Sequence, residues 1–265
     1  MSVLERHRVR VTGHVDAQPM LFAHGFGCDQ AMWRLVAPVF AEDFRVVLFD
    51  HLGSGGSDVD AYDEAAYSGL ERYAQDVLDI CHELDLHDVV FVGHSVSSMI
   101  GVLAQIAEPD VFARLVMVGP SARYIDDGDY VGGFSEADID ELLDLMDSNH
   151  LGWQEPLSGM VMPGPELAEQ RAELDASFCR TRPDIARRFA GVTFRGDNRA
   201  DLPLVSVPTL VLQNSNDPIA PPSAGAYVRD HVPGAVLEVI ETSGHCAHLS
   251  APSETIAAIR AFVLT

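Results

Sequence analysis

The chain is predicted to fold as an α/β protein whose mostly parallel sheet is covered by helices on both faces. Short apolar runs alternate with amphipathic helical patterns along the first half and again near the C-terminus. Several of these runs end in loops that carry Gly, Ser, His and Asp. With 265 residues, 47% of them hydrophobic, the chain can bury one large core and an insertion.

The first half contains five predicted strands and three predicted helices. Residues 8–12 alternate like an edge strand. Buried strands are expected at 19–23, 45–50, 88–92 and 113–119, and helices at 31–40, 70–84 and 98–104. Strands joined by helices pair in parallel, and both faces of such a sheet are covered.

Only helical patterns follow between residues 121 and 198. Ser135 and Asp138 resemble a capping box, with aspartate in place of the usual glutamate, and open a helix. Further helices are expected near 152–161, 165–179 and 183–194, strands at 208–213 and 236–240, and a last helix at 253–264. We therefore expect an α/β core of residues 1–121 and 199–265 and a helical lid of residues 122–198 over the carboxyl edge of the sheet.

The charge and cysteine content exclude several function classes. The net charge is −23, and all 17 basic residues are arginine. Without lysine, Schiff-base chemistry and a Walker-type phosphate loop are excluded, and the acidity disfavours nucleic acid and anionic membranes. The acidic residues of the early lid indicate a solvated face or, alternatively, a partner surface. There is no apolar run of membrane-spanning length and no signal-peptide pattern at the start, which predicts a cytoplasmic protein.

Four cysteines, Cys28, Cys81, Cys179 and Cys246, lack C-x-x-C spacing. This argues against a zinc site or a disulfide framework, and neither a metal nor a cofactor is expected. Cys246 adjoins His245, but sequence adjacency does not give the geometry of a Cys-His pair, so we interpret it as a small buried residue.

The candidate nucleophile is Ser95, in the segment Gly93-His94-Ser95-Val96-Ser97. This segment follows an apolar strand and precedes a helix, as in the tight strand-turn-helix "nucleophile elbow". The usual pattern is G-x-S-x-G, and here Ser97 replaces the last glycine. The backbone N–H of Val96, together with that of Phe26 in His24-Gly25-Phe26-Gly27, is expected to form an oxyanion hole.

A serine nucleophile needs a base and an orienting carboxylate. His245 follows the last predicted strand and Asp217 follows the strand before it, which gives the chain order Ser, Asp, His of α/β-hydrolases. His248 is the alternative base. Asp50 also ends a strand, and we expect it to anchor the following glycine-rich loop.

His24 and His94 flank the candidate site in the sequence. We expect both to make hydrogen bonds within loops rather than to act on the substrate.

The chain resembles the α/β-hydrolase superfamily over essentially its whole length, and within it the bacterial stress regulator RsbQ and the plant strigolactone and karrikin receptors. The motifs that carry this resemblance are His24–Gly27, Leu48–Gly55, Tyr73–Asp79, Phe91–Val96, Leu115–Ser121, Gly132–Phe134 and Gly244–Pro252.

The resemblance implies a four-helix lid, a Ser95–Asp217–His245 triad and a small apolar pocket. That pocket would be lined by Phe26 together with Tyr124, Phe134, Leu142, Phe194 and Ile219. For Leu142 and Ile219, ordinary core packing is an equal alternative. Ala247 stands where relatives often have proline. This difference concerns the conformation of the loop and not the choice of His245 as the base.

Two functions follow from these residues. The first is a cofactor-free serine hydrolase for small apolar esters or lactones. The second is a ligand sensor whose lid recruits a regulatory protein, for example a phosphatase of a signalling cascade. A haloperoxidase or dehalogenase is a weaker alternative, because dehalogenases need a carboxylate where Ser95 stands.

Overall fold

The computed structural model describes residues 1–148, 152–178 and 180–264. Its seven-stranded sheet has the order β1-β3-β2-β4-β5-β6-β7, and every neighbouring pair is parallel except β1 with β3. The strands are β1 (Arg10–Gly13), β2 (Pro19–Ala23), β3 (Arg45–Leu48), β4 (Val89–His94), β5 (Phe112–Val118), β6 (Thr209–Asn216) and β7 (Val236–Ser243). The predicted mostly parallel sheet with an edge strand at the start of the chain is therefore present.

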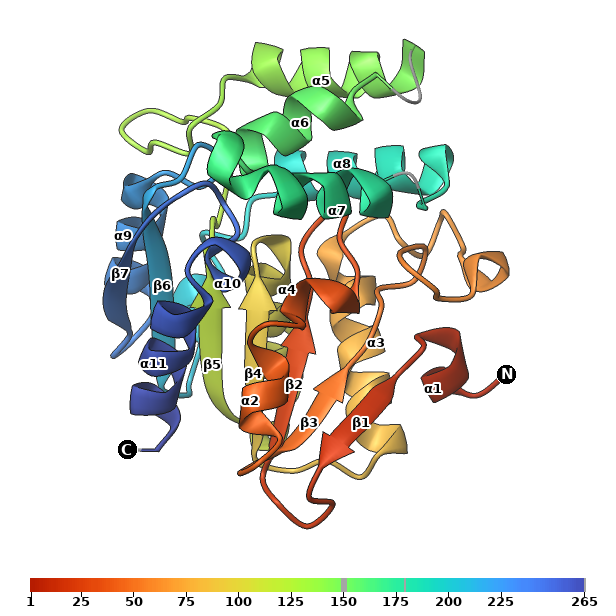
Figure 1. Cartoon of the computed structure of the whole chain (residues 1–265), viewed down its shortest axis with the longest axis vertical. Helices are drawn as coiled ribbons and strands as arrows, with labels where there is room; N and C mark the ends of the chain where they lie inside the picture. Colours follow the sequence, from red (N-terminus) through yellow and green to blue (C-terminus); the bar gives the residue numbers. More distant parts are fainter. Residues whose placement is uncertain (149–151, 179, 265) are drawn as a thin grey trace.

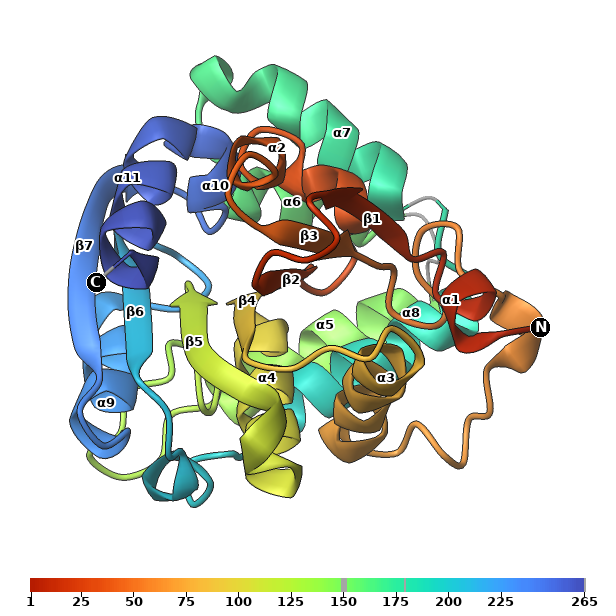
Figure 2. The same ribbon diagram turned by 90° about the horizontal axis from the view of Figure 1, so that it is seen from below.

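Helices cover both faces of this sheet, as Figure 2 shows along the strand direction. Alternate residues of the strands pack on opposite sides, as the period of two in a strand requires. Leu21, Phe91 and Val211 pack with the helices α3 (Leu70–Glu83), α4 (Val96–Ala107) and α9 (Pro222–His231). Phe22, Val92 and Leu210 pack with α2 (Ala37–Phe40) and α11 (Pro252–Val263). The short helices α1 (Val3–Arg6) and α10 (Ala247–Ser250) complete the core.

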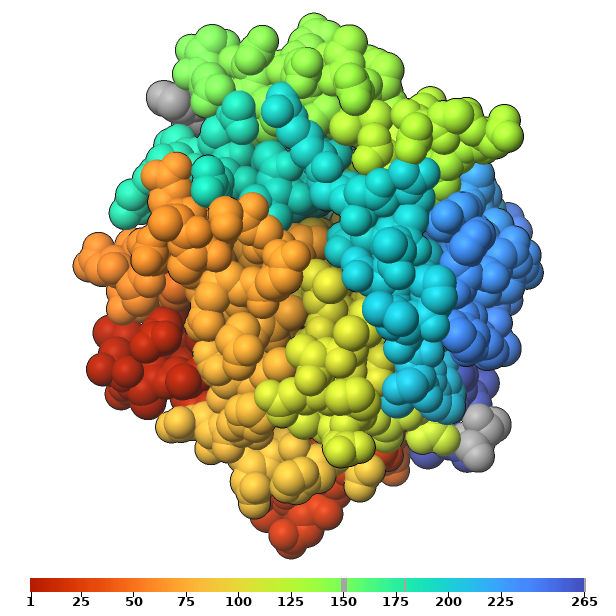
Figure 3. Space-filling view, turned by 180° about the vertical axis from the view of Figure 1, so that it is seen from behind, coloured from red at the N-terminus to blue at the C-terminus, as the bar shows by residue number. Residues whose placement is uncertain are grey.

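Four helices lie between β5 and β6, at the ends of the strands toward which the arrows point in Figure 1. They are α5 (Glu136–Ser148), α6 (Gln154–Val161), α7 (Ala168–Phe178) and α8 (Pro183–Arg195). We call residues 122–198 the lid. On the face shown in Figure 3 the lid meets the orange segment of the core, where the Arg188 guanidinium lies 3.6 Å from the Glu64 carboxylate. An apolar cluster that includes Ile139, Leu157 and Phe178 of the lid continues into the core at Ile219 and Leu249.

Two local predictions need correction. The single helix predicted over 31–40 is a 3₁₀ turn, Gln30–Trp33, followed by the short α2. Pro38 lies in the first turn of α2, where backbone N–H groups have no partner within the helix, so the missing N–H of proline costs no hydrogen bond. The proline therefore begins a helix instead of continuing one. Helix α1 was not predicted, although Ser2 and Glu5 form a capping box at its start.

The start of α5 agrees with the predicted capping box. The Ser135 N–H and hydroxyl both donate to the Asp138 carboxylate at 2.7 Å, and the Asp138 N–H donates back to the Ser135 hydroxyl at 3.2 Å. Aspartate therefore replaces glutamate in this motif without loss of either bond. Among the described residues, no helix is long and apolar enough to cross a membrane.

Candidate active site

Ser95 stands at the turn between β4 and α4, with φ 57° and ψ −125°. A side chain other than glycine is strained there, and such strain is held by the surrounding structure. The Ser95 N–H donates to the Val118 carbonyl of β5 at 2.9 Å, and the Ser98 N–H donates to the Ser95 carbonyl at 2.9 Å. A Cβ on Gly93 would lie 2.5 Å from the Ser97 carbonyl oxygen, so the tight turn needs glycine at this point. These contacts present the Ser95 hydroxyl at the carboxyl edge of the sheet.

Three side chains from separate strand ends form a continuous hydrogen-bonded relay. The Ser95 hydroxyl lies 2.7 Å from Nε2 of His245, and Nδ1 of His245 lies 2.8 Å from Oδ2 of Asp217. The other carboxylate oxygen of Asp217 accepts the N–H groups of Ile219 and Ala220 at 2.9 and 3.0 Å. Because the carboxylate accepts on both oxygens, the His245 proton is on Nδ1 and Nε2 faces the serine as an acceptor.

Tyr124 makes a contact that the sequence did not predict. Its hydroxyl lies 3.1 Å from the Ser95 Oγ, and the ring is buried against Phe194 at a centroid distance of 5.2 Å. Burial raises the pKa of the Tyr124 hydroxyl, which keeps it protonated at neutral pH. Since the Ser95 hydroxyl donates to His245, the Tyr124 hydroxyl donates to Ser95. The family resemblance implies only a place in the pocket wall for this residue.

The two backbone amides predicted for the oxyanion hole belong to Val96 and Phe26. Val96 is the first residue of α4, where a helix leaves its N–H groups unpaired, and Phe26 lies in the loop after β2. Within the described ranges neither of these N–H groups donates a backbone hydrogen bond. They therefore remain the candidates for the oxyanion hole.

Ser97, the departure from the usual elbow pattern, connects the elbow to the loop after β2. Its hydroxyl donates to the His24 carbonyl at 2.5 Å and accepts from Nε2 of His51 at 2.8 Å. The His51 N–H in turn donates to Nε2 of His24, and Nδ1 of His24 donates to the Gly25 carbonyl. A glycine could make neither side-chain bond, so Ser97 fixes the loop that carries Phe26.

The alternative acid and base lie elsewhere. Asp50 accepts the N–H of Gln30 at 2.9 Å and that of Gly56 at 2.8 Å, which anchors the glycine-rich loop as predicted. His248 is fully buried with its ring 4.5 Å from that of Trp33, and burial lowers its pKa to about 3.

His94 donates from Nε2 to the His245 carbonyl at 3.1 Å, a loop hydrogen bond of the kind predicted for it. Desolvation lowers its pKa well below the usual value, so this ring is neutral.

The lid contacts the loop of His245 directly. The His245 N–H donates to the carbonyl of Val161, the last residue of α6, at 2.8 Å. Gly244 has φ +92°, and a Cβ on it would lie 2.6 Å from that same carbonyl oxygen. The position of α6 and the position of the His245 backbone are therefore coupled.

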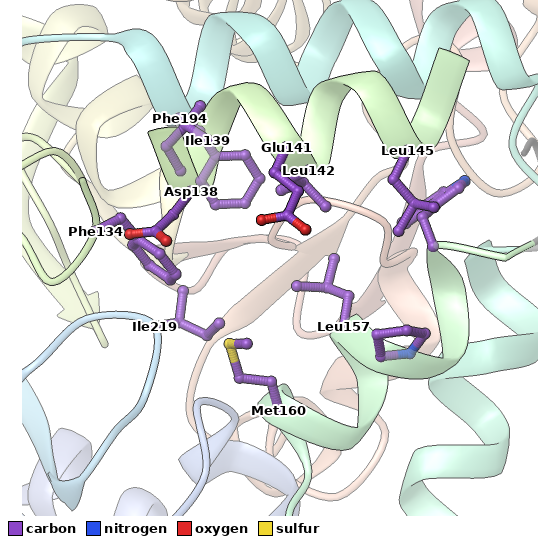
Figure 4. A pocket seen from close by; sticks show the side chains of 12 residues that line it. Phe134, Asp138, Ile139, Glu141, Leu142, Leu145, Leu157, Met160, Phe194 and Ile219 are labelled. Atoms are coloured by element: carbon purple, nitrogen blue, oxygen red, sulfur yellow. The ribbon is translucent and has the colours of Figure 1, made fainter. Parts of the chain in front are cut away.

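Two cavities divide the predicted pocket residues between them. A catalytic cavity of about 30 Å³ includes Ser95, His245, Phe26, Phe194 and Ile219 in its lining. A second cavity of about 350 Å³, which we call the lid pocket, lies between α5 and α6. Figure 4 shows its lining, to which Phe134, Leu142, Phe194 and Ile219 contribute. Thus two of the predicted residues line both cavities, while Tyr124 lines neither and contacts Ser95 instead.

One group of side chains among those described has the spacing of a metal site. The donor atoms of His94, Cys246 and His248 lie within 4.8 Å of one another, and all three residues are buried. No sequence motif indicates this group, because its members come from two distant segments. A thiol and two imidazoles form a donor set that suits zinc. Cys28, Cys81 and Cys246 are free thiols, and Cys179 lies outside the described residues.

Known proteins similar to this chain share its fold and a large part of its sequence. The profile described as "Alpha/beta hydrolase family" matches residues 20–259. A probable esterase of Oryza sativa subsp. japonica is 39% identical over 255 residues, 96% of this chain and 94% of that protein. The strigolactone esterase of Arabidopsis thaliana is 37% identical over 254 residues, with the same coverage. The structure of a hydrolase from Oleispira antarctica superimposes with a TM-score of 0.96 at 39% identity, covering 99% of this chain and 96% of that one.

Proposed function

Because the chain belongs to the α/β-hydrolase family, we propose that it is a serine esterase that cleaves small apolar esters or lactones with Ser95, His245 and Asp217. The family and the mostly parallel fold agree with those predicted from the sequence. The observation that carries the proposal is the relay of 2.7 and 2.8 Å from the Ser95 hydroxyl through His245 to Asp217.

In the first half of the reaction, the Ser95 Oγ attacks the ester carbonyl carbon while its proton moves to Nε2 of His245. The carbonyl oxygen becomes an oxyanion and accepts the N–H groups of Phe26 and Val96. Loss of one such donor typically costs about 10²–10³ in rate. The imidazolium is stabilised by Asp217 and then protonates the alcohol as it leaves.

In the second half, water attacks the acyl-enzyme with His245 as the general base, and Ser95 is released with its proton restored. The Tyr124 hydroxyl donates to Oγ in the resting enzyme. It thereby holds one lone pair of the nucleophile and leaves the proton directed at His245. No step requires a group from outside the chain other than substrate and water.

Covalent labelling tests this proposal. A fluorophosphonate is expected to add once per chain, at Ser95, as measured by intact mass and peptide mapping. The variant Ser95→Ala should remain unlabelled and lose esterase activity. The control is Ser98→Ala, which replaces another serine one turn along α4 and should still be labelled. Undiminished labelling of Ser95→Ala would refute the assignment.

A second function, a ligand sensor whose lid recruits a regulatory protein, is supported by the bond between the Val161 carbonyl and the His245 N–H. A chemical event at His245 would displace the end of α6 through this bond. The relatives include the "Karrikin insensitive 2 receptor CA" of Petunia hybrida, 39% identical over 255 residues. The RsbQ resemblance suggests a phosphatase of a signalling cascade as the partner. This role is tested by capturing partner proteins with and without a hydrolysable ester. If the ester changes the amount captured neither for the native protein nor for Ser95→Ala, the result argues against this role.

A further inference from the structure

The lid pocket is more than ten times larger than the catalytic cavity, at about 350 against about 30 Å³. A space of about 30 Å³ is enough for a water molecule or two. The two cavities share Leu157, Phe194 and Ile219 in their linings. They therefore adjoin at one apolar wall, on the side of the catalytic cavity where the lid helices lie.

The lid pocket has a buried floor and an exposed rim. Leu157, Phe194 and Ile219, at the shared wall, have only 7, 4 and 3% of their surface exposed. Glu141 and Met160, which also line the pocket, are exposed. The pocket therefore extends from solvent to the wall that it shares with the catalytic cavity.

Two carboxylates stand over this apolar lining, and Figure 4 shows both on the side of α5 that faces α6. The Asp138 carboxylate accepts the Ser135 capping bonds, which lower its pKa and keep it charged. The Glu141 carboxylate, one turn further along α5, has no hydrogen-bond or ion-pair partner among the described residues. Within the described part of the chain, the lining residues include no arginine and no histidine to balance these charges.

We propose, resting on the esterase function above, that the lid pocket binds the alcohol portion of the substrate and that Glu141 makes it select uncharged or cationic alcohols over anionic ones. The substrate class is then a short-acyl ester of a bulky apolar alcohol. The short acyl group occupies the catalytic cavity beside Ser95, and the alcohol lies between α5 and α6. A cationic alcohol gains the Glu141 carboxylate and the aromatic faces of Trp153 and Phe134, whereas an anionic one is repelled.

Two isomeric esters test which side of the substrate the lid pocket accepts. 3-Phenylpropyl acetate has a small acyl group and a bulky alcohol, and ethyl 3-phenylpropanoate reverses this arrangement with the same atoms. The expected result is a kcat/KM at least tenfold higher for the acetate. Equal rates, or a preference for the propanoate, would overturn the assignment of the two cavities.

Charge selection is tested with 3-phenylpropyl acetates that carry a para-methyl, para-carboxylate or para-trimethylammonium group. The native enzyme should favour the cation over the anion by about 3- to 30-fold, the range expected for charges at a solvent-exposed rim, and less in 0.5 M salt. Glu141→Gln should reduce this ratio toward one.

The matched control is Glu136→Gln, which removes the same charge from the same helix outside the pocket lining. If both variants reduce the ratio equally, the overall charge of the lid is responsible and the role of Glu141 is refuted. If none of the esters is hydrolysed and Ser95 is not labelled, the esterase function itself fails, and with it this inference. Hydrolysis of all the esters with an unchanged ratio in Glu141→Gln would overturn only the charge selection.

Discussion

Replacing Asp217 with asparagine should inactivate the enzyme by reversing the tautomer of His245. One carboxylate oxygen accepts the N–H groups of Ile219 and Ala220, and the other accepts Nδ1–H of His245. Asparagine has only one carbonyl oxygen, which can face either the two backbone N–H groups or Nδ1 of His245. The NH₂ group then faces the other of these two partners.

The magnitude follows from the two backbone bonds. If the amide oxygen faced His245, the NH₂ group would face two backbone donors, each left unsatisfied at a cost of about 1–3 kcal/mol. The sum, about 2–6 kcal/mol, favours the opposite orientation by about 30- to 10⁴-fold. In that orientation the NH₂ group donates to Nδ1, so the proton is on Nε2 and His245 cannot accept from Ser95. The same change in a serine protease lowers kcat by about 10⁴.

The assay is hydrolysis of p-nitrophenyl acetate, with fluorophosphonate labelling as a second measure of Ser95 activation. We expect Asp217→Asn to lose about 10²–10⁴ in kcat/KM and to label correspondingly slowly. Its circular dichroism and thermal midpoint should stay close to those of the native protein, because the amide keeps three hydrogen bonds. A folded variant that retains activity within tenfold would refute the reasoning about the tautomer.

The remaining predictions concern the groups around this relay. His245→Ala should abolish esterase activity while His248→Ala should retain most of it, and the reverse order would exchange their roles. Gly244→Ala should lower kcat at least tenfold, because its Cβ would displace the Val161 carbonyl, and an unchanged kcat would contradict the coupling of lid and base. Tyr124→Phe should lower kcat about tenfold with little effect on KM, and an unaltered kcat would show that the hydrogen bond to Ser95 does not contribute to the reaction. His248→Phe should reduce the loss of stability in acid. The pKa of His248 is about 3 in the folded protein and about 6.5 in the unfolded chain, so protonation favours unfolding as the pH drops below 6.5. In urea unfolding, the free energy of unfolding of the native protein relative to that of the variant should fall by about 2 kcal/mol from pH 7 to pH 5.

The sequence could predict which residues lie at the carboxyl edge of the sheet. Ser95, Asp217 and His245 each follow an apolar strand, and the ends of parallel strands meet at one edge. The end of a strand is a local feature of the sequence, because the alternation of hydrophobic residues and the turn residues that follow indicate where a strand ends. The chain order Ser, Asp, His therefore follows from the sequence alone, whereas the distances between the side chains depend on the fold.

The contacts made by the lid could not be predicted in this way. Tyr124 and Val161 belong to the lid insertion, and what they contact depends on how the lid packs over the core. A tyrosine in a loop carries no signal that its hydroxyl will lie beside a serine 29 residues away. Nor does a helix-ending carbonyl indicate which N–H it will accept. The same is true of the lid pocket, whose lining comes from α5, α6 and residues of other segments such as Phe194 and Ile219.

These lid contacts give the insertion a direct influence on chemistry. Tyr124 contacts Ser95, and Val161 binds the backbone of His245, so both partners of the proposed proton transfer are tied to the lid. A lid that shifts by about one ångström lengthens its bonds of 3.1 Å to Ser95 and 2.8 Å to His245 beyond hydrogen-bonding distance. Filling the lid pocket with an alcohol group should therefore change the rate of chemistry as well as binding. Esters with the same acetyl group and increasingly bulky alcohols should then differ in kcat, whereas a lid that only binds would change KM alone.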